Sequence, residues 1–87
     1  MAYYETGVIR KGGEVGFWHD NKNTVASDRG KTHHVLYHTY DEKIEKAKAL
    51  LGQGFESKPL ESDVVIFLTQ TEADALVAHK LAVAKSD

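Results

Sequence analysis

A run of five apolar residues, from Val64 to Leu68, constrains the fold of this chain more than any other feature. Polar residues flank the run on both sides, which predicts a strand over 63–69 that is covered on both faces and lies inside a sheet. It is also the longest apolar stretch in the chain, far short of the ~20 residues that a membrane helix needs. We therefore expect no membrane span.

The length of the chain predicts one domain, covering all of residues 1–87. A domain of this size buries only about 60% of the surface that its unfolded chain exposes, so association with a second copy or another protein would add useful burial. The chain has no cysteine, which excludes disulfides, thiolate catalysis and cysteine-ligated zinc. Residues 1–5 carry neither a basic cap nor an apolar run, so we expect no signal peptide and a cytoplasmic location.

Three strands are predicted in the first half of the chain, over 2–10, 14–19 and 32–40, with a weaker short strand over 24–26. Gly12-Gly13 predicts a hairpin, because glycine supplies the positive φ angles that primed turns require. The strand over 32–40 is rich in β-branched and aromatic residues. These three strands are expected to form an antiparallel meander.

Two helices are predicted in the second half, over 41–51 and 71–85. Thr39 with Glu42, and Thr71 with Asp74, have the spacing of a capping box. Gly52 supplies a C-terminal cap for the first helix. The apolar positions recur at helical spacing; they are Ile44, Ala47, Leu50 and Leu51 in the first helix, and Ala73, Leu76, Val77, Leu81 and Ala84 in the second.

The predicted order is therefore three strands, a helix, a strand and a helix. The strand–helix–strand unit over 32–69 is expected to make two parallel strands through a right-handed crossover. The fold class that follows is α+β, with a small mixed or antiparallel sheet and both helices packed on one face. We recognise no resemblance to a known family.

The histidines of the first half do not predict a metal site. His34 and His38 share a strand face but lie about 13 Å apart at ~3.3 Å per residue, while His33 points to the opposite face. A catalytic site built on His19, Asp20 and His38 is the third of the functional hypotheses, because these residue types transfer protons. No motif supports it, and no catalytic residue, metal ligand or cofactor is predicted.

A basic loop over 21–31 carries Lys22, Arg29 and Lys31, which suit phosphate oxygens. Arg29-Gly30-Lys31-Thr32 lacks the first glycine of a P-loop, because that position is Val25, and a strand rather than a helix follows. Residues 41–87 carry six basic and nine acidic side chains, a net charge of −3 that counts against a polyanion partner. Binding of a nucleic acid or nucleotide through this loop, with Trp18 or Tyr37 as a stacking surface, is therefore the alternative hypothesis.

The leading hypothesis rests on the aromatic residues. Strand alternation places Phe17 and Trp18 on opposite faces, so one of them lies outside a core that is covered on one side only. Tyrosine and tryptophan dominate protein interfaces. We therefore expect a small non-enzymatic interaction module, an inhibitor or adaptor, that self-associates and binds another protein through a sheet surface around Trp18 and Tyr37.

Overall fold

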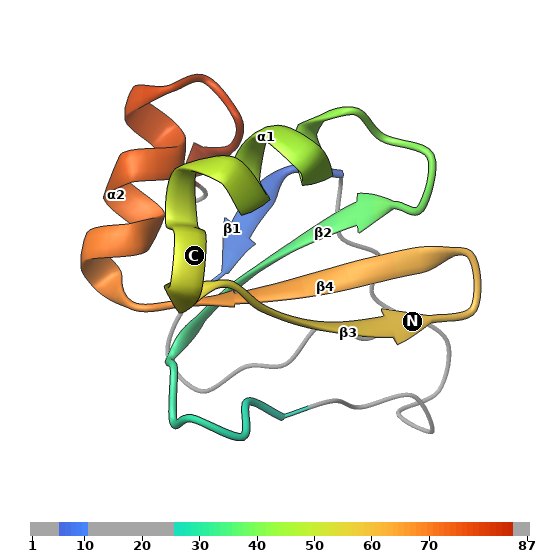
Figure 1. Ribbon diagram of the computed structural model, residues 1–87, viewed down its shortest axis with the longest axis horizontal. Coiled ribbons are helices and arrows are strands. Elements are labelled where there is room, and N and C mark those ends of the chain that lie inside the picture. The colour runs from blue at the N-terminus through green and yellow to red at the C-terminus, as the bar shows by residue number, and fades with distance from the viewer. Residues whose placement is uncertain (1–5, 11–25, 85–87) are drawn as a thin grey trace.

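The computed structural model describes residues 6–10 and 26–84 of the chain (Figure 1). Its elements, in chain order, are β1 (Val8–Arg10), β2 (His33–His38), α1 (Lys43–Leu51), the 3₁₀ turn η1 (Gly52–Gly54), β3 (Glu56–Leu60), β4 (Asp63–Leu68), α2 (Gln70–Ala78) and β5 (Val83–Ala84). The predicted strand over 14–19, its Gly12-Gly13 hairpin and residues 24–25 lie outside the described residues.

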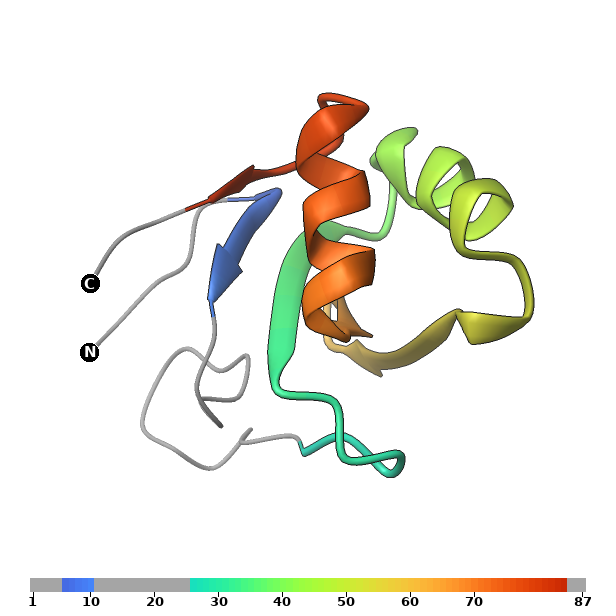
Figure 2. The same cartoon turned by 90° about the vertical axis from the view of Figure 1, so that its left-hand side faces the viewer.

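The strands form one mixed sheet in the order β3-β4-β2-β1-β5, which confirms the predicted α+β class. The pair β1–β5 is parallel and the other three pairs are antiparallel. Both helices lie on the same face of this sheet (Figure 2). β1 and β2 are immediate antiparallel neighbours, with Ile9 opposite Val35. The predicted meander, which put another strand between them, is therefore wrong.

The predicted parallel pairing across 32–69 is also wrong, because β2 and β4 are antiparallel, with His33 opposite Leu68 and His38 opposite Asp63. The cause is β3, a strand that the sequence analysis took for a connector. β3 forms a hairpin with β4, so β3 runs parallel to β2 and β4 lies between them. The crossover through α1 therefore leads to β3 rather than to β4.

The apolar run of β4 is buried on both faces, as predicted. Ile66 and Leu68 face the helices and join a cluster with Ala47 of α1 and Leu76 of α2. On the opposite face, a second cluster contains Leu36, Val65 and Phe67, with Leu60 packed against it. Each face of the strand packs against other apolar side chains, which explains why no residue of the run is polar.

Both helices begin at positions other than those predicted. α1 begins at Lys43, whose backbone N–H donates to Asp41 Oδ1 at 2.9 Å, while the Thr39 hydroxyl donates to Ser62 O instead. α2 is capped by Thr69 and Glu72, which form a reciprocal capping box two residues before the predicted one. Thr69-x-x-Glu72 is the better match to the motif, because glutamate reaches back to the N-cap backbone.

α2 ends at Ala78, seven residues before the predicted end at Lys85. Lys80 has a φ of 60°, Leu81 N–H donates to Leu76 O at 2.9 Å, and Lys80 N–H donates to Val77 O at 3.0 Å. These two bonds define a Schellman motif, in which the left-handed residue is usually glycine. The turn buries Leu81 against Leu76 and releases the chain to form β5.

Candidate functional site

Tyr37, which the sequence analysis placed on a binding surface, is fully buried, with 0% of its surface exposed. It belongs to the cluster under the helices, and its hydroxyl donates to the carbonyl oxygen of Leu81. Burial raises the pKa of this hydroxyl well above its ordinary value, and the charge of Asp41 raises it further. Its ring therefore stabilises the core and is inaccessible to a stacked base or a partner. Trp18 lies outside the described residues.

Lys31, predicted to bind phosphate, makes an internal ion pair. Its Nζ donates to Glu72 Oε1 at 3.0 Å and to the carbonyl oxygen of Gly54, and only 8% of its side chain is exposed. Partial burial alone would raise the pKa of Glu72. The hydrogen bonds from Thr69, together with the hydrogen bond and the charge of Lys31, lower the pKa by more, so the pKa of Glu72 lies below its ordinary value. The charge of Lys31 is thus neutralised.

The other basic residues of the predicted loop do not extend this cluster. Arg29 is exposed, and its Nη1 makes one long hydrogen bond of 3.4 Å to Gln53 O. Lys22 lies outside the described residues. Of the three predicted cations, the described part of the chain therefore presents Arg29 to solvent and holds Lys31 against α2.

Polar contacts fix the 26–32 segment to β3. The Ser27 hydroxyl and the Asp28 backbone N–H donate to the carboxylate of Glu56, at 3.0 and 2.8 Å. From β3, Lys58 Nζ donates to Ala26 O at 2.9 Å and pairs with Asp28 at 3.0 Å. Together with the Lys31–Glu72 pair, these contacts form what we call the clasp. It ties the segment to β3, η1 and α2.

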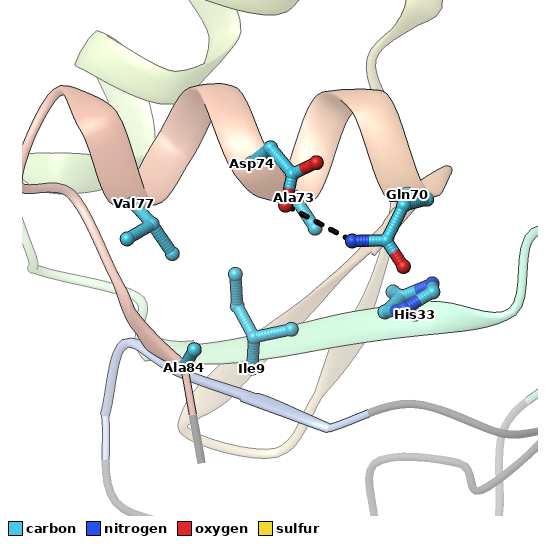
Figure 3. A pocket seen from close by; sticks show the side chains of 7 residues that line it. All are labelled: Ile9, His33, Gln70, Ala73, Asp74, Val77 and Ala84. Carbon is cyan, nitrogen blue, oxygen red and sulfur yellow. Dashed lines mark hydrogen bonds between the residues drawn. The ribbon is translucent and has the colours of Figure 1, made fainter. Parts of the chain in front are cut away.

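A pocket of about 150 Å³ opens between α2 and the strands (Figure 3). We call it the α2 pocket; its lining residues are Ile9, His33, Gln70, Ala73, Asp74, Val77 and Ala84. Four of these residues lie in α2, at spacings of three, one and three, which places them on one face of the helix; they are Gln70, Ala73, Asp74 and Val77. The others come from β1, β2 and β5.

The α2 pocket is apolar at one end and polar at the other. Val77 and Ala84 lie together at one end, while His33 and Gln70 lie at the other, with Ile9 between them on the strand side (Figure 3). At the polar end, Gln70 Nε2 donates to Asp74 Oδ1 at 2.9 Å, and His33 Nδ1 lies 3.0 Å from the Thr32 hydroxyl. The pocket thus offers apolar contact together with hydrogen-bonding groups.

The edge strand β5 borders this pocket through Ala84. Val83 N–H donates to the carbonyl oxygen of Gly7, the residue before β1, at 2.8 Å, so the N–H of Val83 points into the sheet. Successive residues of a strand point in opposite directions, so the N–H of Ala84 points outward, away from β1. The side chain of Val83 is 68% exposed. An apolar, hydrogen-bonding edge therefore lies beside the pocket.

Two further classes of site find no support within residues 6–10 and 26–84. No group of three metal-ligating side chains converges there. His38, a candidate for proton transfer, is paired with Asp63 across the sheet, Nδ1 to Oδ1 at 2.7 Å, and His19 and Asp20 lie outside these ranges. None of the helices in these ranges has the length and apolar character to cross a membrane.

Comparisons with protein-family models, with curated proteins and with solved structures each found no significant match. The α2 pocket was not predicted from the sequence, because its lining depends on where α2 ends and on the existence of β5. One signal was present in the sequence. Gln70, Asp74 and Val77, all exposed, lie on the same helix face as the buried Ala73, so polar and apolar side chains are mixed along one side of α2.

Proposed function

We propose that the protein is a non-enzymatic interaction module that binds an extended segment of another protein along β5 and takes one of its side chains into the α2 pocket. The observation that carries this proposal is the position of the pocket directly beside an exposed sheet edge. Recognition of this kind combines two contributions: backbone hydrogen bonds along the edge give affinity, and side-chain pockets give specificity.

The volume of the pocket supports a side chain as its occupant. Pockets for drug-sized ligands and cofactors typically measure about 300–1,000 Å³. The α2 pocket measures about 150 Å³, and an apolar cavity of roughly that volume holds one benzene molecule. A single side chain of a larger partner matches this volume, and the exposed Val83 and Val77 extend the apolar surface around it.

Self-association belongs to the same proposal. Two copies that pair along β5 about a two-fold axis would each use the outward groups of Ala84, so the interface would be isologous. A partner segment would then compete with the second copy for the same edge. Binding of nucleic acid through the 21–31 loop has weaker support, since Lys31 is already paired with Glu72.

Random linear peptides displayed on phage, selected against the full chain, test this proposal. Ala84→Pro removes the outward N–H and keeps the Val83 bond to Gly7, so selected peptides should lose binding to it. Ser57→Pro is the matched control on the other edge, because Ser57 is exposed and shares its strand side with Pro59, which has no N–H to donate.

Retention of the same peptides by wild type and Ser57→Pro, but not by Ala84→Pro, would support β5 as the binding edge. Equal retention by all three proteins would contradict it. Sedimentation velocity of the same three proteins measures self-association, which Ala84→Pro alone should abolish. Material captured from a lysate only before nuclease treatment would instead support the nucleic-acid alternative, and its binding should weaken steeply with salt.

A further inference from the structure

We propose that the side chain taken into the α2 pocket is an arginine, so that the partner segment is a basic one. This inference rests on the proposed function and specifies its ligand. It is carried by the arrangement of the pocket, in which the carboxylate of Asp74 lies midway along α2, between Val77 and Gln70, beside the apolar side chains of Ile9 and Ala73 (Figure 3).

Among the described residues, Asp74 is the one acidic side chain that lines the pocket. Gln70 Nε2 donates to Oδ1 and orients the carboxylate, and no bond to Oδ2 is present within the described part of the chain. Arg10, the nearest basic residue of β1 in sequence, follows Ile9 and therefore points to the opposite face of the sheet. The charge of Asp74 is thus available to a cation that enters the pocket.

Arginine matches both ends of this pocket. Its three methylene groups can lie along apolar surface while its head reaches polar groups. Its planar guanidinium offers several N–H donors in a fixed fork, which suits the second oxygen of Asp74 and the side-chain oxygen of Gln70 together. A leucine or phenylalanine would fill the apolar end but would cover the polar end without replacing its bonds to water, which costs free energy.

Three capped amino acids serve as probes: N-acetyl-arginine N-methylamide, its citrulline counterpart, which has nearly the same shape but no charge, and its leucine counterpart. Each is titrated into the ¹⁵N-labelled full chain, and binding is followed by amide chemical shifts. We expect the arginine probe to shift Ala73, Val77 and Ala84 and to bind about three- to fivefold more tightly than citrulline at low salt, as for a partly exposed ion pair.

Asp74→Asn removes the charge but keeps an oxygen for the bond from Gln70, and it should lower arginine binding to the citrulline level. Glu45→Gln, which neutralises an exposed acid on α1, is the matched control and should bind arginine as wild type does. The ¹⁵N spectra of both variants also report whether each remains folded.

Leucine binding at least as tight as arginine binding, or arginine binding unaffected by Asp74→Asn, would overturn this inference. Failure of every probe to shift the pocket amides would overturn it as well. None of these results decides the proposed function, because a capped single residue is too short to pair along β5 as an extended segment would. The displayed-peptide experiment decides that separately, through Ala84→Pro.

Discussion

The two edges of the sheet differ in how they meet solvent. At one edge, β3 carries Lys58 and Pro59 and is bound to the 26–32 segment by the clasp. At the other edge, β5 is two residues long, with Val83 exposed and the α2 pocket beside it. Lysine, proline and a covering loop are devices that prevent a strand edge from pairing with another chain. Within the described residues, such devices occur at β3, whereas at β5 only the short length of the strand limits pairing.

This difference shows which surface suits a partner. A protected edge contributes to stability and solubility, whereas an unprotected edge beside a pocket gives a partner both backbone and side-chain contacts. The comparison predicts that substitutions in the clasp change stability, while substitutions at β5 change binding. Each variant below tests one side of that division.

The largest expected effect is at the protected edge. Lys31→Met should lower the free energy of unfolding by about 2–3 kcal/mol, because it leaves the Glu72 carboxylate and the Gly54 carbonyl without their shared donor. Lys58→Met removes a more exposed ion pair with Asp28 and should cost no more than about 1 kcal/mol. Urea unfolding at pH 7 measures both. Equal costs would show that the buried pair does not anchor the clasp.

A smaller effect on stability is expected at the hydrogen bond between the Tyr37 hydroxyl and the carbonyl oxygen of Leu81. Tyr37→Phe keeps the ring but removes the donor to Leu81 O, which leaves a buried acceptor unsatisfied and should cost about 1–2 kcal/mol. Tyr40, which is 95% exposed, provides the control, because Tyr40→Phe should change stability by less than about 0.5 kcal/mol. Urea unfolding of the two variants decides whether the hydroxyl of Tyr37 has a structural role.

The effect of pH on the stability that the clasp contributes through Glu72 should be smaller still. Because the pKa of Glu72 in the folded protein lies below its ordinary value of 4.5, the carboxylate stabilises the fold fully above that value and loses this contribution as pH falls through the folded pKa. The difference in unfolding free energy between wild type and Glu72→Gln should therefore shrink on acidification. A constant difference between pH 6 and pH 3 would contradict the assignment.

Val83→Lys should have the smallest effect on stability, within about 0.5 kcal/mol, because the side chain is 68% exposed. It gives β5 the kind of charge that β3 already carries, so binding of the displayed peptides should fall sharply. Thermal unfolding and a peptide-binding titration measure the two effects. A variant that unfolds readily, or that still binds, would remove the distinction between the two edges.

Local patterns predicted the fold class and the interior strand. The run from Val64 to Leu68 has no polar position, and the structure buries it on both faces. Pairing was predicted less well. β3 alternates between half-buried and exposed residues and contains Pro59, so it lacks the apolar signal of a strand, and its omission reversed the predicted direction of β4.

The end of α2 explains why the site was missed. Lys80 takes the left-handed conformation that usually indicates glycine, and the apolar residues Leu81, Ala82 and Val83 continue a helical pattern in the sequence. Tertiary packing of Leu81 and Ala82 stops the helix there. For the same reason Tyr37 was misplaced: its strand was predicted, but which face the helices would cover depends on contacts between distant segments.

The parallel pairing of β1 with β5 joins Val8 to Val83, residues from opposite ends of the described chain. Closing so long a loop costs conformational entropy before any contact repays it, and within the described residues the register of this pair covers only two residue pairs. We therefore expect β5 to dock late in folding and to detach in a local opening while β2 and β4 remain paired. Such an opening would expose the wall of the α2 pocket formed by Ala84, so the same weak junction would set the rate at which a bound segment enters and leaves.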